Sequence, residues 1–300
     1  MLGKATGSRS AAGAMIVVAA LAAALVGAAP AQAADQERAE SPYDTASPKT
    51  AVASCPNGQE VIGASGRIKD GDGGVRLSAI IPGQNTVTVR GEAFADHEGA
   101  WSVIARAVCA PPSDTLAQAA TIESGPSTAT CPSGTDLSGA GFDLGGGSVL
   151  TGLIPDSIAQ TVTVRTPYIL IGSAPVAYAI CVPEIPLFFT VQFEASSLTN
   201  TIAPKTVTTG GTPPENFPPL TGVGGEINWI HHGPGPTVAR SDVFIDTLML
   251  NADLTSMTMQ AVDRTPPVPT AGRADSAALV ADPEDEWSAT AYADAPYYYY

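Results

Sequence analysis

The chain of 300 residues carries 29 acidic and 14 basic side chains, and its formal net charge is −15 at pH 7. Such an acidic surface repels phosphate backbones and anionic lipid, which disfavours nucleic acids and anionic membranes as partners. Glycine (30 residues) and proline (26 residues) are abundant and only 14% of the side chains are charged, which is typical of an exported β-protein with many turns.

Residues 1–33 have the pattern of a secretory signal peptide. Lys4 and Arg9 supply its basic region, a run of small apolar residues follows, and the sequence AQA at residues 31–33 provides a cleavage site. The apolar run is mostly alanine and glycine, whereas a membrane-spanning helix needs about 20 strongly apolar residues. We therefore expect a cleaved signal rather than an anchor, and a secreted mature chain that begins at Ala34 and has no membrane span.

One passage occurs three times in the mature chain. The sequence CPNGQEVIGASGRI at residues 55–68 returns as CPSGTDLSGAGFDL at 131–144 and as PENFPPLTGVGGEI at 214–227, aligned without a gap. Each copy continues with a second shared passage, at residues 77–90, 150–165 and 245–260. Self-similarity of this kind indicates one structural unit in triplicate.

The three copies divide the chain into segments. Residues 34–48 are acidic and poor in large apolar side chains, so we expect a flexible leader. The predicted segments after it are repeat 1 at 49–111, repeat 2 at 126–183, a connecting strand at 184–204 and repeat 3 at 205–297. Repeat 3 is the longest because it carries insertions at 228–242 and 265–280.

Within repeat 1, short strands are predicted at residues 50–54, 60–68, 74–81, 86–94 and 101–109. Val87 and Val89 alternate with threonines, which is the period of a strand with one buried face. The sequence DGDGG at residues 70–74 predicts a tight turn. It does not fit an EF-hand calcium loop, because the twelfth position is Ile81 and not a carboxylate.

The four cysteines follow the repeat. Cys55 and Cys109 open and close repeat 1, Cys131 and Cys181 open and close repeat 2, and repeat 3 lacks both members together. Two positions that disappear as a pair indicate bonding partners, so we predict the disulfides Cys55–Cys109 and Cys131–Cys181. Export permits their oxidation. The closely spaced cysteines of a four-cysteine zinc site are absent, and no cysteine is left over for catalysis.

The unbridged third copy indicates how the units are arranged. A strand-rich unit of this size has too little interior to be very stable alone, and a disulfide is a usual remedy. Repeat 3 has no disulfide, so we expect it to be stabilised by packing against the other two repeats. The sequence therefore predicts an all-β fold in which three homologous sheet repeats surround a shared core; the alternative is three small tandem β-sandwich units.

The opening of the repeat also resembles known proteins. Cys55-Pro56 with Gly58, and Cys131-Pro132 with Gly134, together with the glycine-spaced strand and the closing cysteine, resemble the repeated unit of the vitelline membrane outer layer protein I family. That resemblance implies a β-prism of three Greek-key sheets about a pseudo-threefold axis. Repeat 3 departs from the pattern at both cysteines. The chain is also similar to exported bacterial CPxG-repeat proteins, which imply no common activity.

The long insertion at residues 228–242 holds the candidate binding residues, because function concentrates on loops carried by a rigid scaffold. They are Trp229, His231, His232 and Arg240. Flat aromatic faces stack on sugars while their polar edges stay wet. We therefore expect a non-enzymatic, exported binding or surface-coating protein whose partner is an extracellular carbohydrate or surface polymer. No catalytic residue, metal or cofactor is predicted, and the sequence does not specify an oligomeric state.

Two alternatives remain open. An extracellular hydrolase or metal-dependent enzyme would use Asp242, Asp246 and the paired histidines, provided that they converge in a pocket. No GxSxG motif surrounds any serine, and His97 has Pro283 at its position in repeat 3, which excludes a histidine mechanism shared by the copies. The other alternative is a purely structural envelope component.

The remaining acidic and aromatic clusters have simpler interpretations. Asp282, Glu284, Asp285 and Glu286 crowd together as a calcium site would require, but a solvated loop explains them better. Trp101 and Trp287 fall in strands and are predicted to be core residues. The four tyrosines at residues 297–300 are predicted to form an unstructured terminus.

Overall fold

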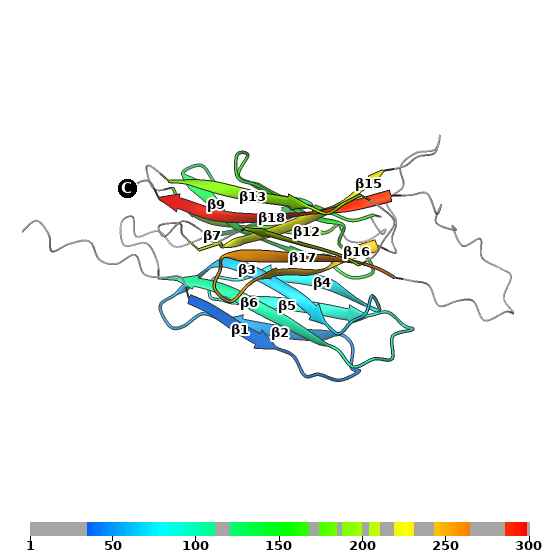
Figure 1. The fold of residues 1–300 in the computed structure, drawn as a ribbon. Helices are drawn as coiled ribbons and strands as arrows, with labels where there is room; N and C mark the ends of the chain where they lie inside the picture. Colours follow the sequence, from blue (N-terminus) through cyan, green and yellow to red (C-terminus); the bar gives the residue numbers. More distant parts are fainter. Residues whose placement is uncertain are drawn as a thin grey trace, which may run out of the picture. The chain divides into compact units, whose positions relative to one another are not determined.

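The computed structural model describes residues 35–111, 121–167, 174–184, 188–199, 204–210, 219–230, 243–264 and 286–298. These residues contain no helix, and so none that could cross a membrane; they form 18 strands in three six-stranded antiparallel sheets (Figure 1). The all-β prediction is confirmed, and the arrangement is consistent with a three-sheet, β-prism-like fold. The predicted signal peptide lies outside the described residues.

Each copy of the repeat contributes six consecutive strands. The first copy supplies β1 (Asp35–Glu40), β2 (Lys49–Ser54), β3 (Glu60–Lys69), β4 (Val75–Pro82), β5 (Thr86–Ala93) and β6 (Ser102–Ala110). The second supplies β7 (Thr121–Pro126), β8 (Thr128–Thr130), β9 (Thr135–Asp143), β10 (Gly152–Asp156), β11 (Thr161–Arg165) and β12 (Val176–Pro183). The third supplies β13 (Phe188–Ser196), β14 (Lys205–Gly210), β15 (Gly222–Ile230), β16 (Val243–Leu250), β17 (Ser256–Asp263) and β18 (Glu286–Tyr298).

Every sheet is shared by two copies. Their strand orders are β1-β6-β3-β16-β17-β14, β2-β5-β4-β9-β12-β7 and β13-β18-β15-β10-β11-β8. In each copy the first, sixth and third strands join one sheet, while the second, fifth and fourth strands join another. Figure 1 shows this exchange where the orange strands β16 and β17 of the third copy lie beside the cyan strand β3 of the first. Each copy is therefore hydrogen-bonded to both of the others in a closed cycle.

The halves of each sheet meet at a junction that we call a seam. The three seams are β3–β16, β4–β9 and β10–β15, and each consists of two residue pairs. The pairs are Arg67 with Thr247 and Gly66 with Leu248, Asp143 with Ala79 and Phe142 with Ile80, and Glu226 with Gly152 and Gly225 with Leu153. These positions are equivalent in the aligned copies, so all three seams have the same pairing register.

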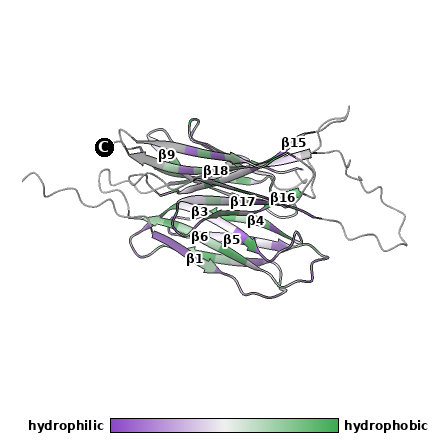
Figure 2. Ribbon diagram, in the orientation of Figure 1, coloured by the Kyte–Doolittle hydropathy of each residue, from purple (hydrophilic) through white to green (hydrophobic). Residues whose placement is uncertain are grey.

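Each copy begins one strand earlier than the sequence comparison placed it. The leader expected to be flexible contains β1, which pairs with β6 from Asp35 opposite Cys109 to Glu40 opposite Ile104. The strands β7 and β13 occupy the corresponding place in the other copies. Figure 2 shows β1 as hydrophilic beside the largely hydrophobic β6. Composition concealed this strand because a polar edge strand is held by backbone hydrogen bonds and needs few apolar side chains.

One hydrophobic cluster contains residues of all three copies, which confirms the shared core and excludes separate sandwich units. Its largest members include Trp101, Phe142 and Trp287, which are 0%, 0% and 2% exposed. Val87 and Val89 are buried as their alternation predicted. The burial of Trp101 and Trp287 confirms the prediction that both are core residues.

A buried lysine accompanies each core tryptophan. The Lys49 ammonium lies 4.7 Å from the centre of the Trp101 ring, and the Lys205 ammonium lies 4.6 Å from that of Trp287. Lys49 also donates hydrogen bonds to the carbonyl oxygens of Pro42, Asp44 and Trp101. A ring face and carbonyl oxygens together replace the water that a buried ammonium loses.

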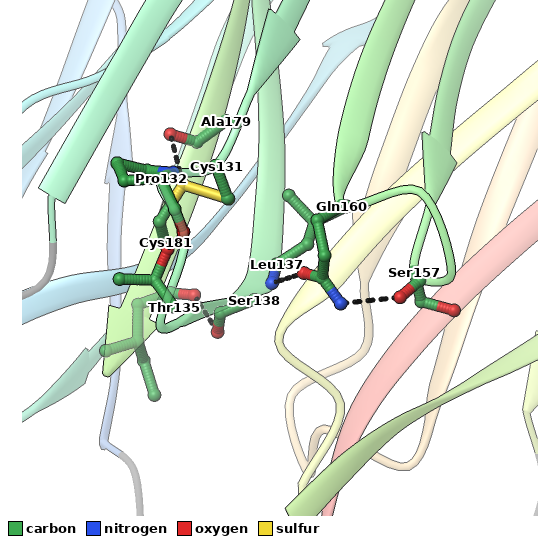
Figure 3. Close-up of a disulfide and its surroundings, with 10 residues drawn as sticks. Cys131, Pro132, Thr135, Leu137, Ser138, Ser157, Gln160, Ala179 and Cys181 are labelled. Carbon is green, nitrogen blue, oxygen red and sulfur yellow. Dashed lines mark hydrogen bonds between the residues drawn. A yellow bond between two sulfur atoms is a disulfide. The ribbon is translucent and has the colours of Figure 1, made fainter. Parts of the chain in front are cut away.

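Both predicted disulfides are confirmed, Cys55–Cys109 and Cys131–Cys181. Figure 3 shows the second one beside the hairpin turn that carries Gln160. The Gln160 side chain accepts a hydrogen bond from the Leu137 backbone N–H and donates one to the Ser157 carbonyl oxygen at 2.6 Å. Gln160 therefore fastens the β10–β11 turn to the start of β9, and the disulfide joins the segment before β9 to β12.

Three glycines hold the copies close together. Gly63, Gly139 and Gly222 occupy the same position of the repeat, and we call them the glycine ring. A Cβ atom on Gly63 would lie 2.1 Å from the Thr221 carbonyl oxygen of the third copy, and one on Gly222 would lie 3.1 Å from the Ser138 carbonyl oxygen of the second. A Cβ atom on Gly139 would lie 3.2 Å from the Cα atom of Gly63. Each glycine thus lies against the backbone of a different copy, and at Gly63 a methyl group would overlap the backbone of the third copy.

We expect Gly63→Ala to destabilise the whole fold, because its methyl group collides with backbone that belongs to another copy. The expected loss is about 3 kcal/mol or more, or a fall in Tm of about 6–12 °C in thermal unfolding. Gly83→Ala is the matched control, since its Cβ would lie no closer than 3.2 Å to a Thr86 side-chain atom. An equal effect of the two substitutions would contradict the role of the glycine ring.

Candidate functional site

Most of the binding residues predicted from the sequence lie outside the described residues. These are His231, His232 and Arg240, and also Asp242 of the enzymatic alternative. The backbone of Trp229 lies in β15 opposite Trp287, but its side chain is not among those described. Asp246 is described, and it lies in β16 at the β3–β16 seam. The site is therefore built around this seam.

Each of the other two seams has an ion pair between an arginine and a carboxylate. At the β4–β9 seam, Arg90 of β5 lies 3.5 Å from the Asp143 carboxylate of β9. At the β10–β15 seam, Arg165 of β11 lies 2.8 Å from the Glu226 carboxylate of β15. In both, an arginine from one copy pairs with an acid from the next across the strand between them.

The β3–β16 seam departs from this pattern. Arg67 occupies the position of the acids Asp143 and Glu226, and Gln260 occupies the position of the arginines. The ion pair is therefore absent here. Arg67 forms no hydrogen bond or ion pair with another described residue, and its charge acts on Asp246 only through space.

Asp246 places a carboxyl group in a β-bulge. The pairing register of β16 with β17 shifts between Ile245 and Thr247, so Asp246 is the extra residue. Bulges re-aim a side chain and are frequent next to functional sites. The equivalent residues of the other copies are Ser78 and Thr151, which are neutral. The third copy alone brings an acid to this place.

The Asp246 carboxyl is buried and incompletely satisfied. The residue is 6% exposed, and its Oδ1 atom has no hydrogen-bond partner in the described part of the chain. Burial raises the pKa of this carboxyl to about 7, because a hydrogen bond from Thr247 and the charge of Arg67 compensate only part of the lost hydration. A buried polar atom without a partner calls for an explanation, and a ligand is one.

These side chains line one cavity of about 730 Å³, which we call the seam groove. Its volume falls in the range of small-molecule sites. The lining residues include Arg67, Asp246, Thr247, Gln260 and Asp263 on the polar side, and Ile68, Val262 and Pro204 on the apolar side. Donors, acceptors and a small apolar surface therefore face the same space.

Residues of the turn predicted at 70–74 also line the seam groove. Asp70, Asp72 and Gly73 all have positive φ, at 57°, 47° and 73°. Aspartate tolerates this conformation better than most residues do. Both aspartates are exposed and line the groove. No group of three histidine, cysteine, aspartate or glutamate residues able to hold a metal ion occurs among the described residues.

The seam groove was not predicted from the sequence, although the aligned copies contained part of the signal. Positions 67, 246 and 260 each differ in charge from both of their equivalents. No protein-family model matches the chain, and no curated protein matches it. The family resemblance of the repeat thus stays a prediction.

A second buried carboxyl belongs to Asp294, next to the glycine ring. Asp294 is 0% exposed and occupies the position of Val108 and Ile180 in the other copies. Its Oδ1 atom accepts a hydrogen bond from Gln192 at 3.2 Å, while Oδ2 has no partner among the described residues. Burial raises the pKa of this carboxyl to about 7. Its position in the interior indicates a structural role.

We expect the protein to lose stability as the pH rises from about 4 towards 7 and then to level off. In the unfolded chain an aspartate releases its proton near pH 4, whereas folded Asp246 and Asp294 hold theirs until about pH 7. The folded state therefore binds more protons across this interval, and raising the pH favours unfolding. Urea unfolding at a series of pH values measures this trend.

Asp294→Val, which copies Val108, should remove part of this pH dependence and stabilise the protein at pH 8 by about 1–4 kcal/mol. Asp253→Val is the control, because that carboxyl is exposed and its pKa is lowered by hydrogen bonds from Thr255. A variant that is equally stable at pH 5 and less stable at pH 8 than the wild type would contradict this expectation.

Proposed function

We propose that the protein is exported and binds extracellular carbohydrate in the seam groove, without catalysing a reaction. One observation carries the proposal. The ion pair present at two seams is missing at the third, where Arg67 and Asp246 line one cavity. Among the described residues Arg67 has no hydrogen-bond or ion-pair partner, and the buried Asp246 Oδ1 atom has no hydrogen-bond partner. Unsatisfied polar groups gathered at a cavity are the expected signature of a site that a polar ligand completes.

The chemistry of the lining favours a polyhydroxylated ligand. Each sugar hydroxyl both donates and accepts, so it can donate to Asp246 and accept from Arg67. Thr247 and Gln260 offer further donors and acceptors, and Ile68 and Val262 offer an apolar surface for the C–H face of a sugar ring. The net charge of −15 disfavours phosphate-rich partners.

Export is supported by the signal-like residues 1–33 and by the two disulfides, which are compatible with an extracellular protein. An extracellular glycan or surface polymer is then the accessible ligand. The insertion at 228–242 begins within the last residues of β15 and ends directly before β16, the strand that carries Asp246. Trp229, His231, His232 and Arg240 therefore stay predicted contributors to binding.

A glycan array with the mature protein tests the proposal. We expect a defined set of glycans to bind, and we expect Arg67→Ala to weaken that binding about tenfold or more, because a charge-assisted hydrogen bond is lost. Arg165→Ala is the matched control, since it removes the arginine of another seam and leaves the groove intact. A blank array, or equal weakening by both substitutions, would overturn the proposal.

A hydrolase is the second candidate, and the Asp246 carboxyl favours it. A carboxyl whose pKa is about 7 retains a proton near neutral pH and can act as a general acid. If the protein is a hydrolase, it should release reducing ends from the glycans that it binds, and Asp246→Asn should stop the release without preventing binding. If no bound glycan is cleaved, the hydrolase candidate is contradicted and the proposed binding function is unaffected.

A further inference from the structure

Among the described residues that line the seam groove, acidic side chains outnumber basic ones. Its lining residues include Asp70, Asp72, Asp246 and Asp263, against Arg67 and Lys69. Lys69 is already engaged, because its ammonium lies 3.1 Å from the Glu40 carboxylate and 5.5 Å from the centre of the Tyr43 ring. Of the described residues in this lining, Arg67 is therefore the basic group that remains free to bind a ligand, and the local field favours positive charge.

Of these groups, the buried Asp246 carboxyl has the greatest need for a hydrogen-bond donor and a counter-charge. It is buried, it lines the groove, and its Oδ1 atom has no hydrogen-bond partner among the described residues. The charge of Arg67 acts on it through space but forms no ion pair with it. An ionised carboxylate in such surroundings is costly unless a counter-charge and a hydrogen bond reach it together. A sugar hydroxyl supplies only the hydrogen bond, whereas an ammonium group supplies both.

We propose, building on the carbohydrate-binding function proposed above, that the seam groove selects sugars that carry a free, protonated amine. The ammonium group donates to the Asp246 carboxylate, and an adjacent hydroxyl or ring oxygen accepts from Arg67. The aspartates of the turn, Asp70 and Asp72, contribute a longer-range attraction that salt screens. Ser78 and Thr151, the equivalents of Asp246, have no charge and cannot make this selection at the other seams.

Three matched ligands test the inference by isothermal titration calorimetry near pH 7. They are the β-1,4-linked trisaccharides of glucosamine, N-acetylglucosamine and glucose, which differ only in the substituent at C2. We expect the glucosamine trisaccharide to bind about 10–100-fold more tightly than the other two, as a charge-assisted hydrogen bond allows. We expect this preference to shrink as salt is added.

Two variants assign the preference to the groove. Asp246→Ser installs the residue that the first copy has at this position, and it should abolish the preference for the amine. Gln260→Arg restores the arginine of the other seams on a half-buried position and adds a repelling charge, so it should also reduce the preference. Arg165→Ala should leave the preference unchanged. Thermal unfolding of each variant checks that it is folded.

The outcomes separate the inference from the function on which it rests. Equal affinity for the three trisaccharides, tighter binding of the acetylated one, or a preference that survives both Asp246→Ser and Gln260→Arg would each overturn the inference and leave carbohydrate binding in place. Failure of all three to bind, while other glycans on the array do bind, would overturn the inference alone. A blank array would overturn the proposed function as well.

Discussion

The contact between backbones at the glycine ring is the constraint on which the rest of the structure depends. Gly63, Gly139 and Gly222 let three equivalent strands approach until carbonyl oxygens and Cα atoms of different copies meet. Only at this separation can each sheet continue from one copy into the next through a seam of two residue pairs. The shared core, the sheltered third copy and the position of the seam groove all follow from that approach.

Much of the fold could be predicted because it is determined by local pattern and by repetition. The alternation around Val87 and Val89 located a strand, and the joint absence of two cysteines from the third copy gave the disulfide pairing. The strand β1 was missed because Asp35–Glu40 is held by its pairing with β6 and has little apolar content. The sharing of each sheet by two copies was missed because pairing across a seam involves residues far apart in the chain, which no local pattern reports.

The candidate site was partly visible in the sequence. Comparing the copies shows that Arg67 and Gln260 reverse the usual acid and arginine positions, and that Asp246 replaces serine or threonine. The sequence cannot show that these three positions adjoin, since β3 belongs to the first copy and β16 and β17 to the third. Nor can it show that Asp246 is a bulge residue with a buried oxygen. Burial and proximity are properties of the assembled sheet.

The closed cycle of seams also determines when the molecule can become complete. The half-sheet β1-β6-β3 comes from the beginning of the chain, whereas its neighbour β16 begins at Val243. During synthesis from the amino end, β3 therefore presents an unpaired edge until β16 (Val243–Leu250) has been made. Unpaired edges recruit other strands and promote aggregation. A carboxy-terminal truncation that removes β16 exposes the same edge of β3 permanently.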